Sequence, residues 1–129
     1  MMRNSLLVFS FFTLVSCYHT ERNCADFKEG TFEFTYIQDG KEKKGRFVRI
    51  NDFSIEYYDG KIDTSSVRWI NDCEFITKKM NPVNSNEEKA IHMKILNTTS
   101  DSYTFEYKYA VKQPNKEQRV VKGVAKKVE

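Results

Sequence analysis

The stretch Phe32-Glu33-Phe34-Thr35-Tyr36, followed by the turn pair Asp39-Gly40, decides the fold of this chain. Apolar side chains alternate with polar ones along it, which is the period of a β-strand with one buried face. Asp-Gly is a strong signal for a tight turn between two antiparallel strands. The stretch therefore predicts the first strand of a β-hairpin.

The same alternation returns along the rest of the chain. Further strands are expected at residues 46–50, 53–58, 67–75, 91–95, 103–109 and 119–128. Turn signals such as Asn51-Asp52 and Asp59-Gly60 separate them, at the roughly ten-residue spacing of an antiparallel meander. The predicted fold class is therefore all-β, with about seven strands in a small barrel, an open half-barrel or a sandwich.

Two segments carry more specific expectations. Trp69 and Cys73 have the same parity in the expected strand 67–75, so both should face the same side. Residues 86–93 could begin a helix, capped by Ser85 or Asn86. The alternation of residues 91, 93 and 95 favours a polar loop over 81–89 and then a strand. This loop is a candidate for function, because binding residues favour loops.

The first residues predict where the protein is located in the cell rather than how it folds. Residues 1–16 have the layout of a secretory signal peptide, with Arg3 ahead of an apolar run. The run has about half of the roughly 20 residues that a membrane-spanning helix needs. An uncleaved signal anchor or an ordinary secreted protein is the alternative. The chain is then divided into a signal peptide (1–16), a lipidated tether (17–23) and a β-rich domain (24–129).

The apolar run ends in Leu14-Val15-Ser16-Cys17, which resembles the lipobox of bacterial lipoproteins. The resemblance implies that Cys17 carries lipid, becomes the new N-terminus and anchors the protein to a membrane of the cell envelope. Tyr18 rather than Asp follows the cysteine, and by analogy with sorting rules this permits the outer membrane. The periplasmic and the surface face both stay open.

Charge and length narrow the class of protein. Removal of residues 1–16 leaves about 113 residues, enough for one domain with one core. It leaves 20 basic and 18 acidic side chains, because Arg3 is the only charged residue removed. A nucleic-acid-binding protein would show a clustered basic excess, so we expect no nucleic-acid partner.

The cysteine count is odd, but lipidation of Cys17 would leave the pair Cys24 and Cys73. The envelope outside the inner membrane is oxidising, so a disulfide between them is expected. Closing a loop of about 50 residues contributes up to ~4 kcal/mol in the chain-entropy model. The alternative is a reactive thiol, which would need a nearby base and an electropositive pocket.

The chain lacks motifs for metal binding or catalysis. His19 falls in the tether and His92 on the expected outer face of a strand, and no CxxC, HxH or HExxH spacing is present. A Cys73–His92 pair would lose its thiol to the disulfide, and GxSxG and SxxK are absent. We therefore expect no metal, no cofactor and no catalytic residue.

Charged side chains are expected on solvated faces. The strand carboxylates Glu33, Glu56, Glu74 and Glu106 each alternate with aromatic residues. The basic clusters are Lys41, Lys43, Lys44, Arg46 and Arg49, and Lys122, Lys126 and Lys127. They could contact anionic lipid or a polyanion. We favour solvated hairpin tips and edges, where lysines also prevent strand-to-strand aggregation.

Two patterns resemble a group of small lipoproteins of Gram-negative bacteria. They are Cys24-Ala25-Asp26-Phe27-Lys28-Glu29-Gly30-Thr31-Phe32 and Trp69-Ile70-Asn71-Asp72-Cys73-Glu74-Phe75. The resemblance implies a lipid-anchored β domain with a paired cysteine and supplies no activity. Some of these lipoproteins bear the name of a DNA topoisomerase IV subunit. The lipobox, the small size and the lack of a catalytic-tyrosine context argue against that activity here.

Three functions follow as hypotheses. The leading one is a non-enzymatic, lipid-anchored module of the cell envelope that binds or scaffolds an envelope protein partner. The second is a lipocalin-like carrier of a small apolar ligand, because the chain has ten Phe, seven Tyr and one Trp and a barrel of about eight strands can hold one ligand. The same aromatic side chains could instead fill a core. The third is an envelope hydrolase.

Overall fold

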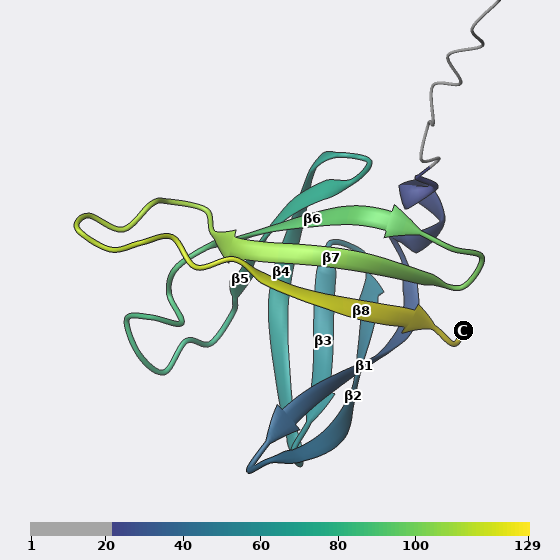
Figure 1. The fold of residues 1–129 in the computed structure, drawn as a ribbon, viewed down its shortest axis with the longest axis horizontal. Helices are drawn as coiled ribbons and strands as arrows, with labels where there is room; N and C mark the ends of the chain where they lie inside the picture. The colour runs from purple at the N-terminus through teal and green to yellow at the C-terminus, as the bar shows by residue number, and fades with distance from the viewer. Residues whose placement is uncertain (1–21) are drawn as a thin grey trace, which may run out of the picture.

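The computed structural model describes residues 22–129 and shows an eight-stranded antiparallel β-barrel (Figure 1). The elements are a short 3-10 helix η1 (Cys24–Phe27) and the strands β1 (Gly30–Gln38), β2 (Lys41–Ile50), β3 (Phe53–Tyr58), β4 (Lys61–Asn71), β5 (Glu74–Lys79), β6 (Ile91–Thr98), β7 (Ser102–Tyr109) and β8 (Val121–Lys127). Each strand pairs with the next, and β8 closes the barrel on β1. The expected all-β meander is confirmed, and it forms a barrel. The signal peptide, the lipobox and residues 17–21 of the tether lie outside the described residues.

The tight turns are those that the sequence predicts. Asp39-Gly40 joins β1 to β2, and Asp59-Gly60 joins β3 to β4, with φ values of 53°, 72°, 49° and 69°. Asn51-Asp52 joins β2 to β3, with φ values of 49° and 65°. A two-residue hairpin turn with positive φ at both central positions matches the twist of the strands that it connects. These turns fix the register of the first four strands.

The strand count differs from the expected seven because residues 67–75 form two strands. The chain reverses at Asp72-Cys73, between β4 and β5. The Asn71 side chain supports this turn, since its Oδ1 accepts a hydrogen bond from the Cys73 backbone N–H at 2.9 Å. Trp69 and Cys73 nevertheless pack against the same core, as expected. Residues 80–90 form a loop that leads into β6, which confirms the preferred interpretation of that segment.

The apolar core fills the end of the barrel that η1 covers, which we call the closed end. The rings of Phe27, Phe32 and Tyr103 pack with centroids 5.4 to 6.4 Å apart, and each residue is at most 2% exposed. A disulfide between Cys24 and Cys73 joins η1 to the β4–β5 turn across 49 residues of sequence. The expected cysteine pair is therefore present, and it fastens the cap to the barrel. Among the described residues, no helix is long and apolar enough to cross a membrane.

Arg49 of β2 is buried in the closed end, with 3% of its surface exposed. Its Nε donates to the Lys28 carbonyl oxygen at 3.0 Å, and its Nη2 donates to the Phe27 carbonyl oxygen at 2.5 Å and to the Tyr103 hydroxyl at 3.3 Å. Five aromatic rings surround the guanidinium at 4.9 to 5.7 Å: Phe32, Phe47, Trp69, Phe75 and Tyr103. Cation–π attraction and hydrogen bonds thus take the place of water and of a counter-ion.

The expectation that Arg49 lies on a solvated edge is therefore wrong. Arg49 is two residues from Phe47, so both side chains face the same side of β2, and Phe47 belongs to the core. Arg46 of the same strand is exposed, as expected. The basic cluster thus mixes residues of both faces of one strand.

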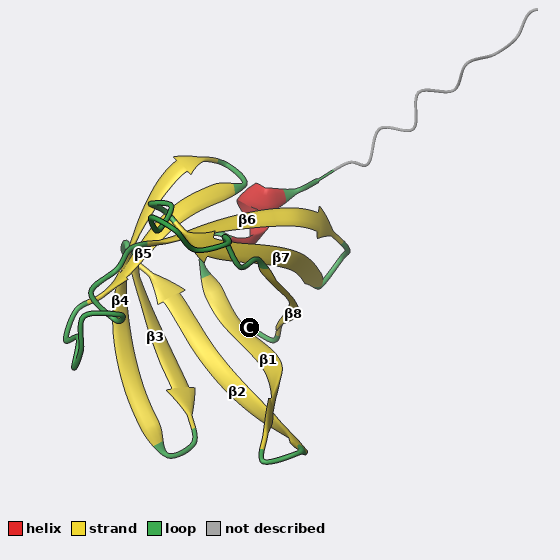
Figure 2. Ribbon diagram, turned by 60° about the vertical axis from the view of Figure 1, so that its left-hand side comes forward, coloured by secondary structure: helices red, strands yellow, loops and turns green. Residues whose placement is uncertain are grey.

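The barrel opens on one side, because β1 separates from β8 beyond the closed end. β1 pairs with β2 from Gly30 to Gln38, but with β8 only from Phe32 to Phe34. Figure 2 shows the β1–β2 and β3–β4 hairpins fanning away from β6, β7 and β8 toward the end opposite η1. We call the gap between the second half of β1 and the first half of β8 the lumen opening.

Arg49→Met is expected to lower the free energy of unfolding by about 2–4 kcal/mol, because it leaves two buried backbone carbonyls without a donor and removes the cation from its rings. Arg46→Met, on the outer face of the same strand, should lower it by less than ~1 kcal/mol. Urea unfolding of both variants measures the difference. Similar losses in the two variants would contradict the role given to the buried guanidinium.

Candidate functional site

Strand pairing identifies the side chains that face the barrel interior. Residues directly opposite each other on paired antiparallel strands lie on the same face. The fully buried Phe32 lies opposite Phe47, Phe47 lies opposite Glu56 of β3, and Glu56 lies opposite Asp63 of β4. Glu56 and Asp63 therefore face the interior. The expectation that Glu56 lies on a solvated face is wrong.

The strand alternation misassigned β3 because aromatic residues occupy both of its faces. Phe53 and Tyr57 have one parity and Tyr58 has the other, so alternation alone could not decide which face is buried. The Asn51-Asp52 turn carried the missing signal. A two-residue turn at this position sets Ile50 opposite Phe53, and three residues further along each strand it sets Phe47 opposite Glu56.

Two rows of aromatic rings line the interior and diverge toward the lumen opening. One row follows β1, where Phe34 and Tyr36 lie 5.9 Å apart. The other follows β7, where Phe105 and Tyr107 lie 6.2 Å apart. The rows meet at the closed end, where the ring centroids of Phe32 in β1 and Tyr103 in β7 are 5.7 Å apart. Toward the lumen opening, Phe34, Tyr36, Phe105 and Tyr107 are half-buried although they face inward.

Glycines on the neighbouring strands let two of these rings lie close to the barrel wall. A Cβ at Gly45 would lie 2.3 Å from the Phe34 ring, and a Cβ at Gly123 would lie 2.7 Å from the Phe105 ring. Each glycine lies directly opposite its ring in the pairing. Glycine at these positions therefore leaves the interior wider than a larger side chain would.

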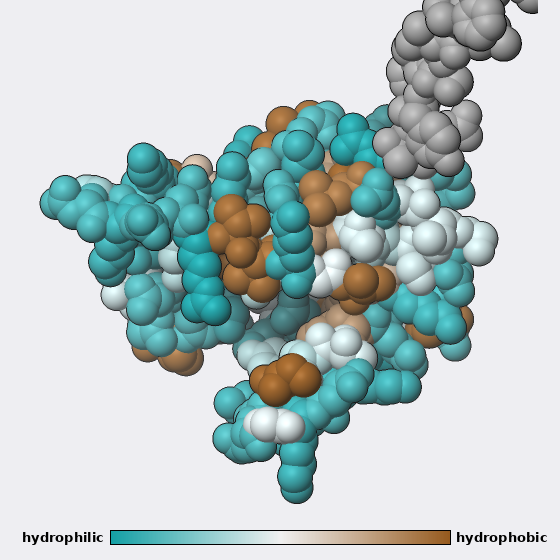
Figure 3. Space-filling model, in the orientation of Figure 1, coloured by the Kyte–Doolittle hydropathy of each residue, from teal (hydrophilic) through white to brown (hydrophobic). Residues whose placement is uncertain are grey.

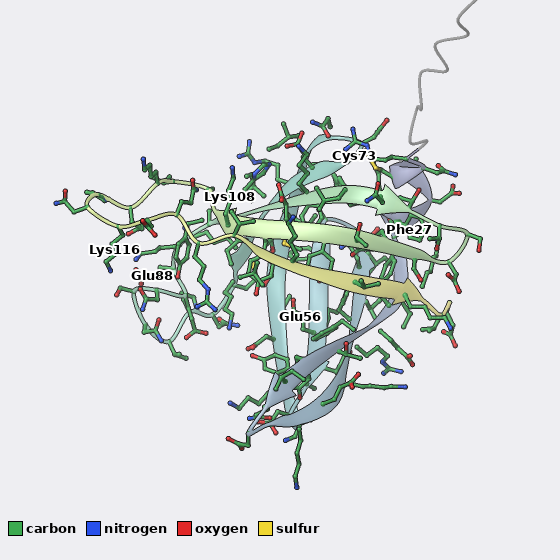
Figure 4. The ribbon with its side chains drawn as sticks, in the orientation of Figure 1. Phe27, Glu56, Cys73, Glu88, Lys108 and Lys116 are labelled. Atoms are coloured by element: carbon green, nitrogen blue, oxygen red, sulfur yellow. A yellow bond between two sulfur atoms is a disulfide. The ribbon has the colours of Figure 1, made fainter. Side chains whose placement is uncertain are left out.

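The surface is hollowed at the lumen opening. The space-filling view shows a recess between β8 and the β1–β2 hairpin, with hydrophobic atoms on its rim (Figure 3). In the same orientation, Glu56 lies between β8 and that hairpin (Figure 4). In this view the recess overlaps the position of Glu56, which faces the barrel interior by its strand pairing.

Glu56 is a half-buried interior acid without a direct partner. Within residues 22–129 its carboxylate makes no hydrogen bond to a side chain and no ion pair. Burial raises the pKa of Glu56 above its ordinary value, and the nearby negative charge of Asp63 raises it further. The positive charge of Lys79 opposes this shift. The environment therefore disfavours the charged form of this carboxyl group.

A polar network lies beyond Glu56, toward the end of the barrel opposite η1, which we call the open end. The Tyr58 hydroxyl donates to Asp63 Oδ2 at 2.7 Å, and Lys79 Nζ lies 3.4 Å from the same oxygen. Lys79 Nζ also lies 2.7 Å from Oε1 of Glu87, in the β5–β6 loop. The Tyr58 hydrogen bond lowers the pKa of Asp63. The Glu87 hydrogen bond raises the pKa of Lys79. The loop singled out from the sequence thus contributes one residue, Glu87, to the interior network.

The β1–β2 hairpin adds a second polar group at the open end. Lys43 lies opposite Tyr36 and faces inward near the hairpin tip. Its side chain is 40% exposed, so the expected solvation holds in part. Its Nζ donates to Gln38 Oε1 at 2.9 Å and lies 3.8 Å from Asp59 Oδ1. The other lysines of this cluster, Lys41 and Lys44, are exposed as expected.

The remaining candidate residues lie elsewhere. His92 is on the outer face, with Nε2 3.1 Å from Oε1 of Glu74, as expected for that strand. Glu33 and Glu106 also lie on the outer face, by their pairing with Arg46 and with Lys94 and Lys122. Lys122 and Lys126 are exposed, whereas Lys127 is half-buried and its Nζ donates to the Asp26 carbonyl oxygen at 2.7 Å.

No group of three or more His, Cys, Asp or Glu side chains in residues 22–129 is arranged to hold a metal ion. Cys24 and Cys73 are both in the disulfide, so neither supplies a thiol. A separate hollow of about 160 Å³ lies at the closed end, beside Arg49 and Trp69.

Protein-family models, curated proteins and solved structures were compared with the chain, and none matches it.

Glu56→Gln is expected to stabilise the fold at neutral pH by ~1 kcal/mol, the size of a favourable single substitution. The raised pKa means that the folded state holds the proton more firmly than the unfolded state does. The stability contributed by this proton is complete below the unfolded pKa and is lost as the pH rises through the folded pKa. Gln does not titrate, so its advantage should grow as the pH rises through that interval.

Thermal unfolding across the range from acidic to neutral pH measures this effect. Glu33→Gln, on the outer face of β1, is the matched control and should change the melting temperature little at any pH. A Glu56→Gln variant that is less stable than the wild type at neutral pH would contradict the assigned environment.

Proposed function

We propose that this protein is a non-enzymatic binding module whose barrel takes up a small apolar or amphipathic ligand through the lumen opening. One observation carries the proposal: inward-facing aromatic side chains stay half-buried on both sides of an opening that leads to a carboxyl group. Tyr36 of β1 and Tyr107 of β7 are the clearest examples. A ligand between the two rows would cover these rings.

The contrast between the two ends of the barrel supports this proposal. At the closed end, Phe32, Ile95 and Ala125 have no exposed surface, which is the packing of a filled small barrel. Toward the lumen opening, the inward-facing Ile91 and Met93 of β6 are half-buried. Apolar surface that remains accessible inside a barrel is a favourable lining for a ligand. Barrels of eight strands have room for one small ligand, as in lipocalins.

A second part of the proposal concerns the location of the protein in the cell. The sequence of residues 1–17 supports lipidation at Cys17 and a place in the cell envelope, with the outer membrane permitted. Arg22 and Asn23 lie at the closed end, where Arg22 Nη1 donates to the Ile95 carbonyl oxygen and the Asn23 backbone N–H donates to Thr98 Oγ1. Five residues of chain span at most roughly 17 Å. A lipid on Cys17 would therefore keep the closed end near the membrane.

The scaffold hypothesis and the hydrolase hypothesis predict different results. A module that scaffolds an envelope protein should be isolated from its own membrane as a protein complex, without a small molecule. A ligand carrier should retain a small molecule in native mass spectrometry. A hydrolase would need an acid–base pair in contact with substrate, and Glu56 with its raised pKa is the interior group suited to that chemistry.

Val121→Trp is expected to block ligand uptake. Val121 of β8 faces the interior opposite Tyr107, beside the lumen opening, and an indole there would occupy the space between the aromatic rows. The probe is N-phenylnaphthylamine, an uncharged apolar compound whose fluorescence rises when it leaves water. The variant should bind it at least about 10-fold more weakly, a difference of roughly 1.4 kcal/mol.

Val124→Trp is the matched control, since Val124 lies on the outer face of the same strand and is 55% exposed. It should bind the probe like the wild type. Absence of probe binding to the wild type, or equal weakening in both variants, would refute uptake through the lumen opening.

Lipidation is tested by metabolic labelling with a radioactive fatty acid. The wild type should carry the label in the membrane fraction, and Cys17→Ala should lose it, because the thiol of Cys17 is the proposed site of acylation. Cys24→Ser serves as the control and should retain the label, since that cysteine is in the disulfide. An unlabelled wild type would overturn the proposed anchor.

A further inference from the structure

We propose that Glu56 makes the lumen selective for ligands that carry a cationic amine head group. This inference rests on the proposed function, because it assumes that a small ligand enters the barrel. It adds the chemical class of the ligand and the residue that recognises it. The argument follows from the charges and rings that surround Glu56.

The open half of the lumen has more negative than positive charge. Lys79 is already shared between Asp63 at 3.4 Å and Glu87 at 2.7 Å. Glu56 therefore has no cation of its own within ion-pair distance in residues 22–129, and three carboxyl groups surround one ammonium group. Lys43 pairs with Asp59 instead. A ligand that brings a positive charge would supply the missing partner.

Arg49, the cation at the closed end of the barrel, does not neutralise Glu56. Arg49 is bound to the carbonyl oxygens of Phe27 and Lys28 and to the Tyr103 hydroxyl. It makes no ion pair with Glu56 in the described residues. The raised pKa of Glu56 agrees with this lack of compensation.

The aromatic lining suits the same kind of ligand. The rings of Tyr36 and Tyr58 meet edge to face 6.3 Å apart, and Tyr58 is two residues from Glu56 on the same face of β3. A cation between ring faces and a carboxylate is attracted by both. The molecule already uses ring faces for a cation at Arg49. An anionic head group would meet repulsion from Glu56 and would find Lys79 already paired with Asp63 and Glu87. A neutral hydroxyl would gain only a hydrogen bond.

The test uses three probes with the same eight-carbon chain: octylamine, octanol and octanoate. Calorimetric titration of the purified protein at neutral pH gives each affinity. The wild type should bind octylamine at least about 10-fold more tightly than octanol, and octanoate most weakly. Glu56→Gln should lose about 10-fold or more in octylamine affinity and keep its octanol affinity within about twofold. Glu33→Gln should bind all three as the wild type does.

The outcomes separate this inference from the proposed function. If octanoate binds as tightly as octylamine, or if Glu56→Gln leaves octylamine affinity unchanged, the amine selectivity is wrong while uptake into the barrel stands. If the wild type binds none of the three probes and no N-phenylnaphthylamine, both proposals fail. Because Glu56→Gln is expected to fold at least as stably as the wild type, lost affinity cannot be assigned to unfolding. A melting curve of each variant verifies this.

Discussion

The guanidinium of Arg49 is the interaction on which the closed end of this barrel depends. Burial of an unpaired charge is expensive unless hydrogen bonds and polarisable groups replace its water. Here the backbone carbonyls of Phe27, the last residue of η1, and of Lys28, which follows it, accept its hydrogen bonds, and five ring faces surround it. The same contacts give η1 a fixed place on the barrel. A four-residue 3-10 helix could not hold its position through its own backbone hydrogen bonds, so the arginine and the Cys24–Cys73 disulfide hold it from two sides.

This concentration of packing at one end explains how the other end can stay open. The rings of Phe27, Phe32 and Tyr103 and the side chains around them form a dry core near η1, and stability depends mostly on such buried apolar contacts. β1 and β8 need to pair only over Phe32–Phe34 to close the sheet. Beyond that point the hairpins can diverge without exposing the core. The barrel thus divides into a half that provides stability and a half whose inward-facing aromatic groups stay half-buried. This division suits the proposed ligand site, because binding residues are commonly positioned by a rigid scaffold.

The sequence predicted what local rules control and missed what depends on register across strands. Alternation and the Asp-Gly turns predicted the meander, and cysteine arithmetic predicted the disulfide, because each follows from a short stretch or a simple count. Arg49 and Glu56 were both placed on the wrong face. In β2 the parity with Phe47 would have been enough to correct Arg49. In β3 aromatic residues on both faces removed the contrast on which alternation depends, and only the register set by the Asn51-Asp52 turn places Glu56 opposite Phe47. The ion pair from Lys79 to Glu87 could not be foreseen at all, since a loop without periodicity gives no register.

Arg49 and Glu56 are interior charges of opposite sign whose surroundings differ, and the difference bears on function. Arg49 has three hydrogen-bond acceptors and five ring faces around its guanidinium, so its charge contributes to the fold. Glu56 has neither a donor nor an ion-pair partner among the described residues, and burial raises its pKa. A neutral side chain of similar size would serve the fold better at this position. Groups that weaken a fold where they lie are concentrated at binding and catalytic sites, because function requires them there. The partner that Glu56 lacks within the described part of the barrel is the one that the proposed amine ligand would supply.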